Sequence, residues 1–293
     1  MKSGFVAVVG RPNVGKSTLV NQMVGTKVTI TSSRPQTTRN AIRGVVNGDG
    51  FQIVMVDTPG LHKPRTELGS RLNSVVYGTL ADSDAVIFVI DATMPVGPGD
   101  RLIADRLIES GADVVVAVNK VDAATRVQTV SQLVEAAEWP FEHYFPLSAL
   151  TGDGVDEIVL EMVTRLPEGP QYYPEDMLTD QPEALVIAEI IREKFLDRLR
   201  DELPHALVVR LEDLEQREDG MIDISADLIV ERESQKGIVI GKGASLLKTA
   251  GTEARMELES ILGDRVNLDL RVVVEKDWQR HPQLLDRLGF EEL

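Results

Sequence analysis

Apolar residues in the first half of the chain fall into short, nearly continuous runs, at 5–9, 44–46, 51–56, 85–90 and 114–118. Such runs are typical of parallel strands that are buried on both faces of a sheet. Stretches with helical spacing lie between them, for example at 101–110 and 127–138. This alternation predicts a doubly wound α/β domain built around one central sheet.

The pattern stops near residue 166. The stretch 167–174 holds three prolines and a glycine, so it cannot continue a helix and is typical of a linker. We therefore expect a first domain over 1–168, a linker over 169–181, and a second domain with a C-terminal tail over 182–293.

The second part has a different order of elements. A helix is expected at 182–199, strands at 206–213 and 221–231, a glycine-rich turn at 237–243, a helix at 244–262 and a strand at 266–275. This order predicts a smaller α+β domain.

Composition narrows the class of protein. Hydrophobic residues make up 43% of the chain, cysteine is absent, and no apolar run approaches the length of a membrane helix. We expect a cytoplasmic protein. The net charge of −16 argues against nucleic-acid binding unless a local basic patch overrides it.

A phosphate-binding pattern follows the first strand. Its glycines let successive backbone N–H groups point at phosphate oxygens, and the next helix adds the positive end of its dipole. Lys16 is placed to reach the β- and γ-phosphates, and the Ser17 hydroxyl can bind Mg²⁺. The pattern comprises Gly10, Arg11, Pro12, Asn13, Val14, Gly15, Lys16 and Ser17.

A second segment for the phosphates follows the buried run 51–56. An acid at the carboxyl end of a buried strand lies where ligands bind in open α/β sheets, so Asp57 is a candidate Mg²⁺ ligand. The Gly60 N–H can meet a γ-phosphate because no side chain blocks its approach. The segment comprises Asp57, Thr58, Pro59, Gly60 and Leu61.

Two further segments predict a guanine pocket. The Asp122 carboxylate can accept two hydrogen bonds from guanine, whereas adenine offers no such pair of donors. The Lys120 stem can cover the base, and a small residue near 149 lets a backbone N–H approach guanine O6. The segments are Asn119, Lys120, Val121 and Asp122, then Ser148 and Ala149.

The polar stretch 31–40 is expected to be a loop. In GTPases a threonine from this loop reaches Mg²⁺ and the γ-phosphate only in the triphosphate state. Thr37 and Thr38 are the candidates.

Taken together, these motifs resemble the Era branch of the TrmE–Era–EngA group of GTPases. The motifs are GRPNVGKS from residue 10, QTTRN from 36, DTPGLHKP from 57, NKVD from 119 and SAL from 148. The stretch 231–241 is similar to the entry of the KH domain in that family, and the tail segments 277–280 and 288–290 are similar as well. The resemblance covers nearly the whole chain.

The resemblance implies a GTPase that binds GTP, GDP and Mg²⁺, with Lys16, Thr38 and Gly60 acting on the reacting phosphate. The threonine before the arginine binds the metal in this group, so Ser17, Thr38 and Asp57 are the expected metal site. Leu61 stands near the position of a water-orienting glutamine, which implies slow intrinsic turnover. Asn13 matches an asparagine that helps bind K⁺ in some relatives, which makes K⁺ a further candidate.

The expected partners are the 3′ end of small-subunit ribosomal RNA and the 30S subunit, whose maturation the family assists. The family also implies a peripheral membrane-associated fraction, and we expect a monomer. A KH domain holds nucleic-acid backbone with a Gly-x-x-Gly loop, but here Ala244 replaces the second glycine. The expected RNA-binding residues are Lys236, Gly241, Lys242, Gly243 and Lys248.

Two other functions fit the same residues. The second domain could bind protein instead of RNA, which the altered glycine loop favours. Alternatively, the chain could be an RNA-binding scaffold that holds GTP but scarcely hydrolyses it, which Leu61 allows.

Overall fold

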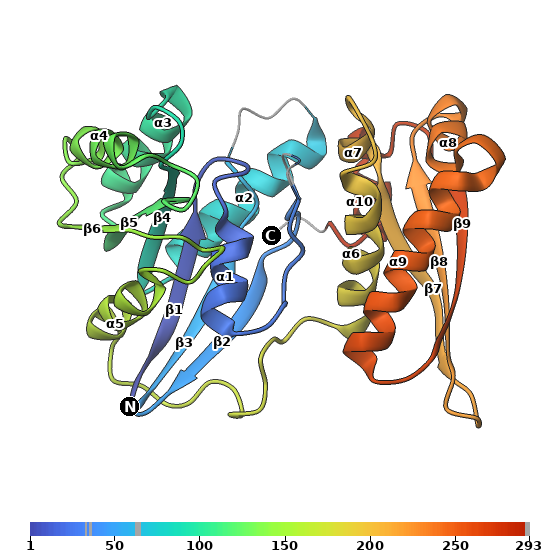
Figure 1. Ribbon diagram of the computed structural model, residues 1–293, viewed down its shortest axis with the longest axis horizontal. Coiled ribbons are helices and arrows are strands. Elements are labelled where there is room, and N and C mark those ends of the chain that lie inside the picture. The colour runs from blue at the N-terminus through green and yellow to red at the C-terminus, as the bar shows by residue number, and fades with distance from the viewer. Residues whose placement is uncertain (33, 35–36, 62–65, 291–293) are drawn as a thin grey trace.

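Valine- and isoleucine-rich strands build the six-stranded sheet of the first of two lobes (Figure 1). The computed structural model describes residues 1–32, 34, 37–61 and 66–290. The strand order is β2-β3-β1-β4-β5-β6. All neighbouring strands are parallel except β2 and β3, which are antiparallel. The strands are β1 (Lys2–Val9), β2 (Ile42–Gly48), β3 (Phe51–Asp57), β4 (Ala85–Asp91), β5 (Val114–Asn119) and β6 (His143–Pro146).

Helices cover both faces of this sheet. Side chains of β1 alternate between two apolar clusters, Val6 and Val8 in one and Ala7 and Val9 in the other. The first cluster includes residues of α1 and α5, and the second includes residues of α2, α3 and α4. The sheet is therefore doubly wound, as the alternation of runs predicts. The helices are α1 (Lys16–Val24), α2 (Glu67–Ala81), α3 (Pro98–Ser110), α4 (Arg126–Ala136) and α5 (Val155–Arg165).

The segment 169–181 packs along the β2 edge of this sheet. The Val45 N–H donates to Leu178 O at 2.9 Å, and the Thr179 hydroxyl donates to Arg43 O at 2.7 Å. The predicted linker thus covers part of an edge strand, whose backbone groups would otherwise remain open.

A three-stranded sheet with order β7-β8-β9 forms the second lobe. β7 and β8 are antiparallel, β8 and β9 are parallel, and α6, α8 and α9 share an apolar core with them. The main elements are α6 (Glu183–Leu196), α7 (Leu203–Ala206), β7 (Val208–Gln216), β8 (Ile222–Val230), α8 (Glu233–Ile240), α9 (Ser245–Leu262) and β9 (Val266–Val274). Short elements are η1 (Lys242–Ala244), η2 (Trp278–Arg280) and α10 (Pro282–Arg287).

Two expectations for the second lobe are wrong. Gly237 lies inside helix α8, not in a turn, because Gln235 caps the start of this helix and Val239 anchors it in the core. Ala206 belongs to α7, and β7 begins two residues later.

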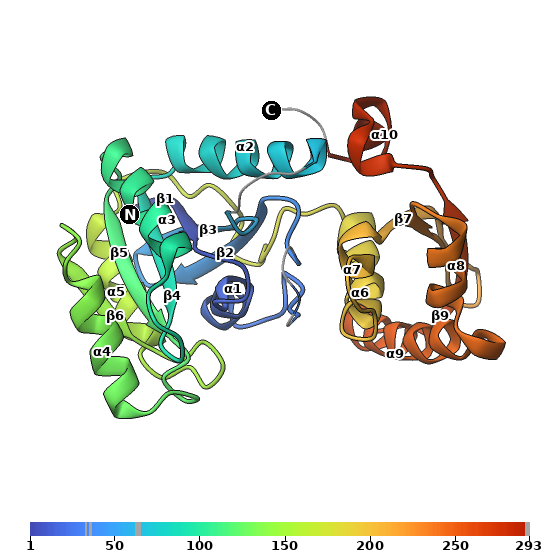
Figure 2. The ribbon, with the colours of Figure 1, turned by 90° about the horizontal axis from the view of Figure 1, so that it is seen from above.

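A fourth apolar cluster joins the two lobes. Leu68 and Leu72 of α2 pack with Trp278, Leu285 and Phe290 of the tail, and Figure 2 shows α2 beside α10 from above. In the described part of the chain, no helix has both the length and the apolar character needed to cross a membrane.

Candidate functional site

The loop between β1 and α1 is shaped by glycines with positive φ angles, 154° at Gly10 and 97° at Gly15. A Cβ at Gly15 would lie 2.3 Å from Nδ2 of Asn119. Gly15 therefore permits both the turn of the loop and its close contact with the segment after β5.

Lys16 lies at the centre of this loop with its side chain buried. Its Nζ donates to Gly10 O at 3.2 Å and to Arg11 O at 3.0 Å. Burial lowers the pKa of the Lys16 ammonium to about 8, and the nearby Asp57 partly opposes this shift. A buried cation of this kind is suited to bind an anionic ligand such as phosphate.

Hydroxyl and carboxylate oxygens meet beside Lys16. The hydroxyls of Ser17 and Thr38 lie 2.9 Å apart, and Thr38 and Thr29 donate to Oδ2 of Asp57 at 3.2 and 3.0 Å. Burial raises the pKa of Asp57, although Lys16 and the three hydroxyls oppose the shift. Among the described residues, no donor reaches the buried Oδ1 of Asp57. Hard cations such as Mg²⁺ prefer oxygen ligands, and these residues supply three.

The structure distinguishes the two threonines of the loop after α1. Thr38 is buried next to Asp57, whereas the Thr37 hydroxyl donates to Arg34 O at 2.7 Å. Thr38 is therefore the one placed with the oxygen cluster.

The segment after β3 is anchored on both sides. The Thr58 hydroxyl donates to Val8 O at 2.8 Å, and a Cβ at Gly60 would lie 2.9 Å from Pro12 N. Only a glycine allows this approach to the phosphate-binding loop. Pro59 is buried, and Leu61 packs against the apolar cluster on the α3 side of the sheet.

The segment after β5 connects the phosphate-binding loop to the segment after β6. Nδ2 of Asn119 donates to Val14 O at 2.8 Å, and its Oδ1 accepts from the Ala149 N–H at 2.9 Å. The Ala149 N–H already donates to Asn119, so guanine O6 would be a second acceptor of the same N–H. Val121 packs against the same apolar cluster as Leu61.

Asp122 and Ser148 form the outer part of this region. The Ser148 hydroxyl donates to Oδ1 of Asp122 at 2.6 Å, and Asp122 is exposed at the surface. The carboxylate is thus oriented by a neighbouring hydroxyl while it remains accessible to a ligand.

A cavity of about 560 Å³ connects several of these groups. Its lining comes mainly from the phosphate-binding loop and from the loop after α1, and one residue, Asp197, comes from the second lobe. The lining residues are Pro12, Asn13, Gly15, Lys16, Ser17, Thr18, Thr31, Ser32, Arg34, Thr37, Thr38, Gly60, Lys120 and Asp197.

A separate groove of about 280 Å³ lies between α9 and β9 in the second lobe. Its lining combines apolar and basic side chains: Leu247, Lys248, Gly251, Thr252, Arg255, Leu268 and Leu270. The glycine loop lies at the start of the same helix. Within the described chain, Lys236, Lys242 and Lys248 near this loop form no ion pair, so their charges are available to a ligand.

Three residues of the glycine loop, Gly241, Gly243 and Ala244, have positive φ angles. Gly241 and Gly243 have φ of 75° and 61°, and Ala244 has φ of 59°. The left-handed conformation costs a non-glycine residue about 1 kcal/mol or more. The turn before α9 is therefore formed with backbone strain at Ala244.

Two family models and many relatives match this chain. A model described as 50S ribosome-binding GTPase matches residues 5–120, and a KH-domain model matches residues 202–279. The GTPase Era of Mycobacterium bovis (strain BCG / Pasteur 1173P2) is 52% identical over 295 residues, which cover 98% of each chain. The GTPase Era of Mycobacterium sp. (strain KMS) is 50% identical over 295 residues, 99% of each chain. The chain belongs to the Era family of GTPases.

Solved Era structures have the same fold. A variant of Aquifex aeolicus Era bound to GDP·AlF4⁻ matches with a TM-score of 0.95 and 39% identity, over 99% of this chain and 100% of that one. A structure of Era in complex with MgGDPNP and nucleotides 1506–1542 of 16S ribosomal RNA has the same TM-score and identity, over 99% of each chain. This Era-family chain is a GTPase, and the predicted order of a P-loop domain followed by a KH domain is confirmed.

The sequence analysis did not predict a role for Asp91, which ends β4 beside the Era-family nucleotide site. Lys120 donates from Nζ to Asp91 Oδ2 and Asn13 O, each at 2.6 Å, so its ammonium links β4 to the phosphate-binding loop. Burial alone would raise the pKa of Asp91, but hydrogen bonds from Lys120 and Thr93 outweigh it and lower that pKa. The sequence does contain a signal for Asp91, because this acid ends a buried strand, just as Asp57 does.

Other missed residues had no signal in the sequence. Asp197 lines the cavity from the other lobe, and the buried Asp100 of α3 pairs with the predicted Arg11 at 2.8 Å. The groove residues Leu268 and Leu270 look like ordinary strand positions until α9 is seen beside them.

Proposed function

We propose that this Era-family GTPase couples its nucleotide state to binding of the 3′ end of small-subunit ribosomal RNA, and so assists maturation of the 30S subunit. One observation carries the proposal. Thr38 lies in the oxygen cluster beside Lys16, and the next residue, Arg39, is buried against the second lobe. A change in the nucleotide site therefore reaches the lobe that holds the groove. The Era structure with MgGDPNP and 16S ribosomal RNA supports this assignment.

Residues 1–168 are proposed to form the nucleotide domain, 169–181 the linker, and 182–293 the KH-type domain with its tail. α6 belongs to the second unit because it shares an apolar core with α9 and the β7–β9 sheet. The linker packs on the first sheet, as described above, and so limits how far the two units can separate.

The nucleotide is proposed to bind along one edge of the first sheet. The backbone from Gly10 to Ser17 and the ammonium of Lys16 would hold the phosphates. Asp122 would select guanine, with Lys120 against the base and Ser148 and Ala149 beside it. Asn119 holds the two halves of the site together through Val14 and Ala149.

Mg²⁺ fits the oxygen cluster of Ser17, Thr38 and Asp57, where it would neutralise charge on the phosphate oxygens. The buried Oδ1 of Asp57, which no described donor satisfies, supports this site. The resemblance also supports K⁺ at Asn13. Thr38, Gly60 and Lys16 would stabilise charge on the γ-phosphate, whereas Leu61 cannot orient a water molecule. We therefore expect slow intrinsic turnover.

The groove between α9 and β9 is proposed to hold single-stranded RNA. Its leucines would offer an apolar floor for unstacked bases, and Lys248 in its lining would contact phosphate. Lys236 of α8 and Lys242 of the glycine loop would contact phosphates next to the groove. Gly241 and Gly243 let the backbone of the loop approach the RNA chain. These lysines form the local basic patch that a chain of net charge −16 needs.

Filter binding tests the RNA assignment. The probes are a single strand matching the 3′ end of small-subunit RNA, a scrambled strand of equal length, and a duplex of the same sequence. We expect the matching strand to bind tightest and the duplex weakest. Equal binding of all three RNAs, or no binding at all, would contradict the proposal and favour a protein partner.

We also propose a monomer that works in the cytoplasm, with a fraction bound peripherally to membrane. The support is the family resemblance together with the lack of a membrane-crossing helix in the described residues. Cell fractionation with a salt wash is the test. A membrane fraction that resists the wash would contradict peripheral binding.

A further inference from the structure

Asp197 brings a negative charge from the second lobe into the cavity that the proposed function assigns to phosphates. It is the C-terminal cap residue of α6, and it lines the cavity together with Lys16, Ser17 and Thr38. It is also the one acidic side chain among the described residues that line this cavity. The negative end of the α6 dipole lies at the same place. An anionic ligand in the cavity therefore meets an unfavourable field from this side.

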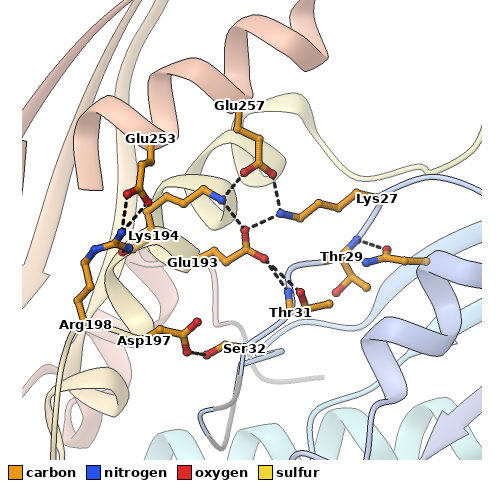
Figure 3. A network of polar contacts seen from close by, with 11 residues as sticks. Lys27, Thr29, Thr31, Ser32, Glu193, Lys194, Asp197, Arg198, Glu253 and Glu257 are labelled. Carbon is orange, nitrogen blue, oxygen red and sulfur yellow. Dashed lines mark hydrogen bonds and ion pairs between the residues drawn. The ribbon is translucent and has the colours of Figure 1, made fainter. Parts of the chain in front are cut away.

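Contacts with the loop after α1 hold this carboxylate in position (Figure 3). The Ser32 hydroxyl donates to Oδ1 of Asp197 at 2.8 Å. One turn earlier on α6, Oε1 of Glu193 accepts from the Thr31 N–H at 2.9 Å, and Arg192 donates to Thr37 O at 2.7 Å. Two side chains of α6 and its C-cap residue Asp197 thus contact the loop that carries Thr38.

Ion pairs also connect this part of α6 with α9. Lys27 pairs with Glu193 and with Glu257 of α9, at 2.5 and 2.6 Å (Figure 3). Two cations near Asp197 also form ion pairs: Lys194 of α6 pairs with Glu193 and Glu257, and Arg198, just after α6, pairs with Glu253. The end of α6 that precedes Asp197 is therefore held by ion pairs with Lys27 of the first lobe and with α9.

We propose that Asp197 is a specificity-determining residue that weakens GTP binding relative to GDP binding. The added phosphate gives GTP more negative charge than GDP, so a fixed carboxylate at the cavity repels GTP more strongly. GTP binding must either bear this repulsion or displace α6 from the loop, and both lower the affinity for GTP alone. The proposal rests on the assignment of the cavity to guanine nucleotides.

Binding of GDP and of GDPNP to the full chain, measured by calorimetry at low salt with Mg²⁺, tests the proposal. Asp197→Asn keeps an acceptor for Ser32 but removes the charge. We expect it to raise the affinity for GDPNP over that for GDP by roughly 3- to 30-fold. The change should shrink as salt screens the charge.

Two variants serve as controls. Asp201→Asn removes the same charge four residues further on, from an exposed side chain that does not line the cavity, and should leave the ratio of affinities unchanged. Asp197→Glu keeps the charge and should keep a ratio close to that of the unsubstituted chain. Equal changes in GDP and GDPNP affinity in Asp197→Asn, or the same shift in Asp201→Asn, would overturn the proposal. An unsubstituted chain that binds neither nucleotide would instead overturn the proposed function.

Discussion

At the scale of single residues, Lys16 and Asp122 carry the nucleotide assignment. Lys16 is a buried cation held by two backbone oxygens, and Asp122 is an exposed carboxylate oriented by Ser148. The first is suited to phosphate of any nucleotide, whereas the second is suited to one base. Substitutions at the two positions should therefore have different effects.

Lys16→Ala should weaken GTP and GDP binding by about 3 kcal/mol, because it removes a charge-assisted contact to phosphate from a buried site. Calorimetry measures the loss, and circular dichroism checks that the variant is folded. A folded variant with undiminished affinity would place the phosphates elsewhere.

Nucleotide binding should also take up protons at alkaline pH. The pKa of Lys16 is about 8 in the nucleotide-free chain, so at pH 8.5 most of its ammonium is deprotonated, whereas at pH 6.5 it is charged. Bound phosphate favours the charged form and raises the pKa again. GDP binding should therefore take up protons at pH 8.5, and fewer at pH 7.5, where more of the ammonium is already charged. Calorimetry in two buffers of different ionisation enthalpy measures this, and Lys16→Ala should abolish it.

Asp122→Asn should shift selectivity from GTP towards XTP. The amide offers a donor to the extra carbonyl of xanthine, where the carboxylate offers only acceptors. Competition between XTP and GTP for the variant gives the ratio. If GTP still binds as before and XTP gains nothing, guanine is recognised by other groups.

A site residue can be identified from the sequence when its neighbours in the chain determine its role, and not when a distant contact does. Lys16, Asp57 and Asp122 belong to short sequence patterns at the ends of buried strands. Their neighbours in the chain are therefore enough to predict their chemistry. Asp197 enters the site only because α6 lies against the loop after α1, a contact between residues 165 positions apart at Ser32. No local pattern encodes such a contact.

At the scale of elements, the glycine loop of the second lobe is the least regular part of the site. Its Ala244 takes a left-handed conformation that suits glycine. Helix α8 was not predicted from the sequence, because Gly237 suggests a turn. In the structure the burial of Val239 stabilises the helix. Tertiary packing overrides local propensity here.

Ala244→Gly should stabilise the protein by about 1 kcal/mol, because it relieves the strain of a positive φ at a residue with a Cβ. RNA affinity should stay equal or rise, since the backbone becomes more accessible to phosphate. Urea denaturation measures the first effect and filter binding the second. Ala81→Gly, in the last turn of α2, is the control and should destabilise. A loss of stability in Ala244→Gly would mean that the loop is not strained.

Replacing Lys242 and Lys248 together by Ala should weaken RNA binding and flatten its salt dependence. Each lysine that meets a phosphate contributes about one unit to the log–log slope, so the double variant should lose about two. The control is Arg101→Gln with Arg217→Gln, two cations paired with acids away from the groove. An unchanged slope in the lysine variant would mean that RNA is held elsewhere.

At the scale of the whole molecule, the two lobes are joined by contacts of the nucleotide-site loops. Nη1 of Arg39 donates to Leu207 O at 2.9 Å, and Nη2 donates to Pro204 O and His205 O at 3.2 and 2.7 Å. The guanidinium also lies over the Trp278 ring, 5.7 Å from its centroid. On the other side, Arg71 of α2 pairs with Asp286 of α10 at 2.6 Å. The helix after the Asp57 segment is thus tied to the tail.

Arg39→Lys should destabilise the protein by about 2–4 kcal/mol, because a compact ammonium lacks the spread of a guanidinium and cannot reach all three carbonyls, two of which are in buried contacts. Urea denaturation checks this. Arg43→Lys is the matched control, since Arg43 is more exposed and pairs only with Asp180 in the described contacts; its effect should stay within about 0.5 kcal/mol. Equal effects of the two substitutions would show that the Arg39 contacts do not hold the lobes together.

The measurement that tests the central claim most directly is the affinity of the full chain for the ribosomal 3′-end RNA, with Mg²⁺, in GDPNP and in GDP. Coupling energies between sites are typically about 1–3 kcal/mol. The loop that bears Thr38 and Arg39 links the two sites, so we expect RNA to bind at least about 5-fold tighter with GDPNP than with GDP. Equal RNA affinity with both nucleotides, each bound at saturation, would contradict the account.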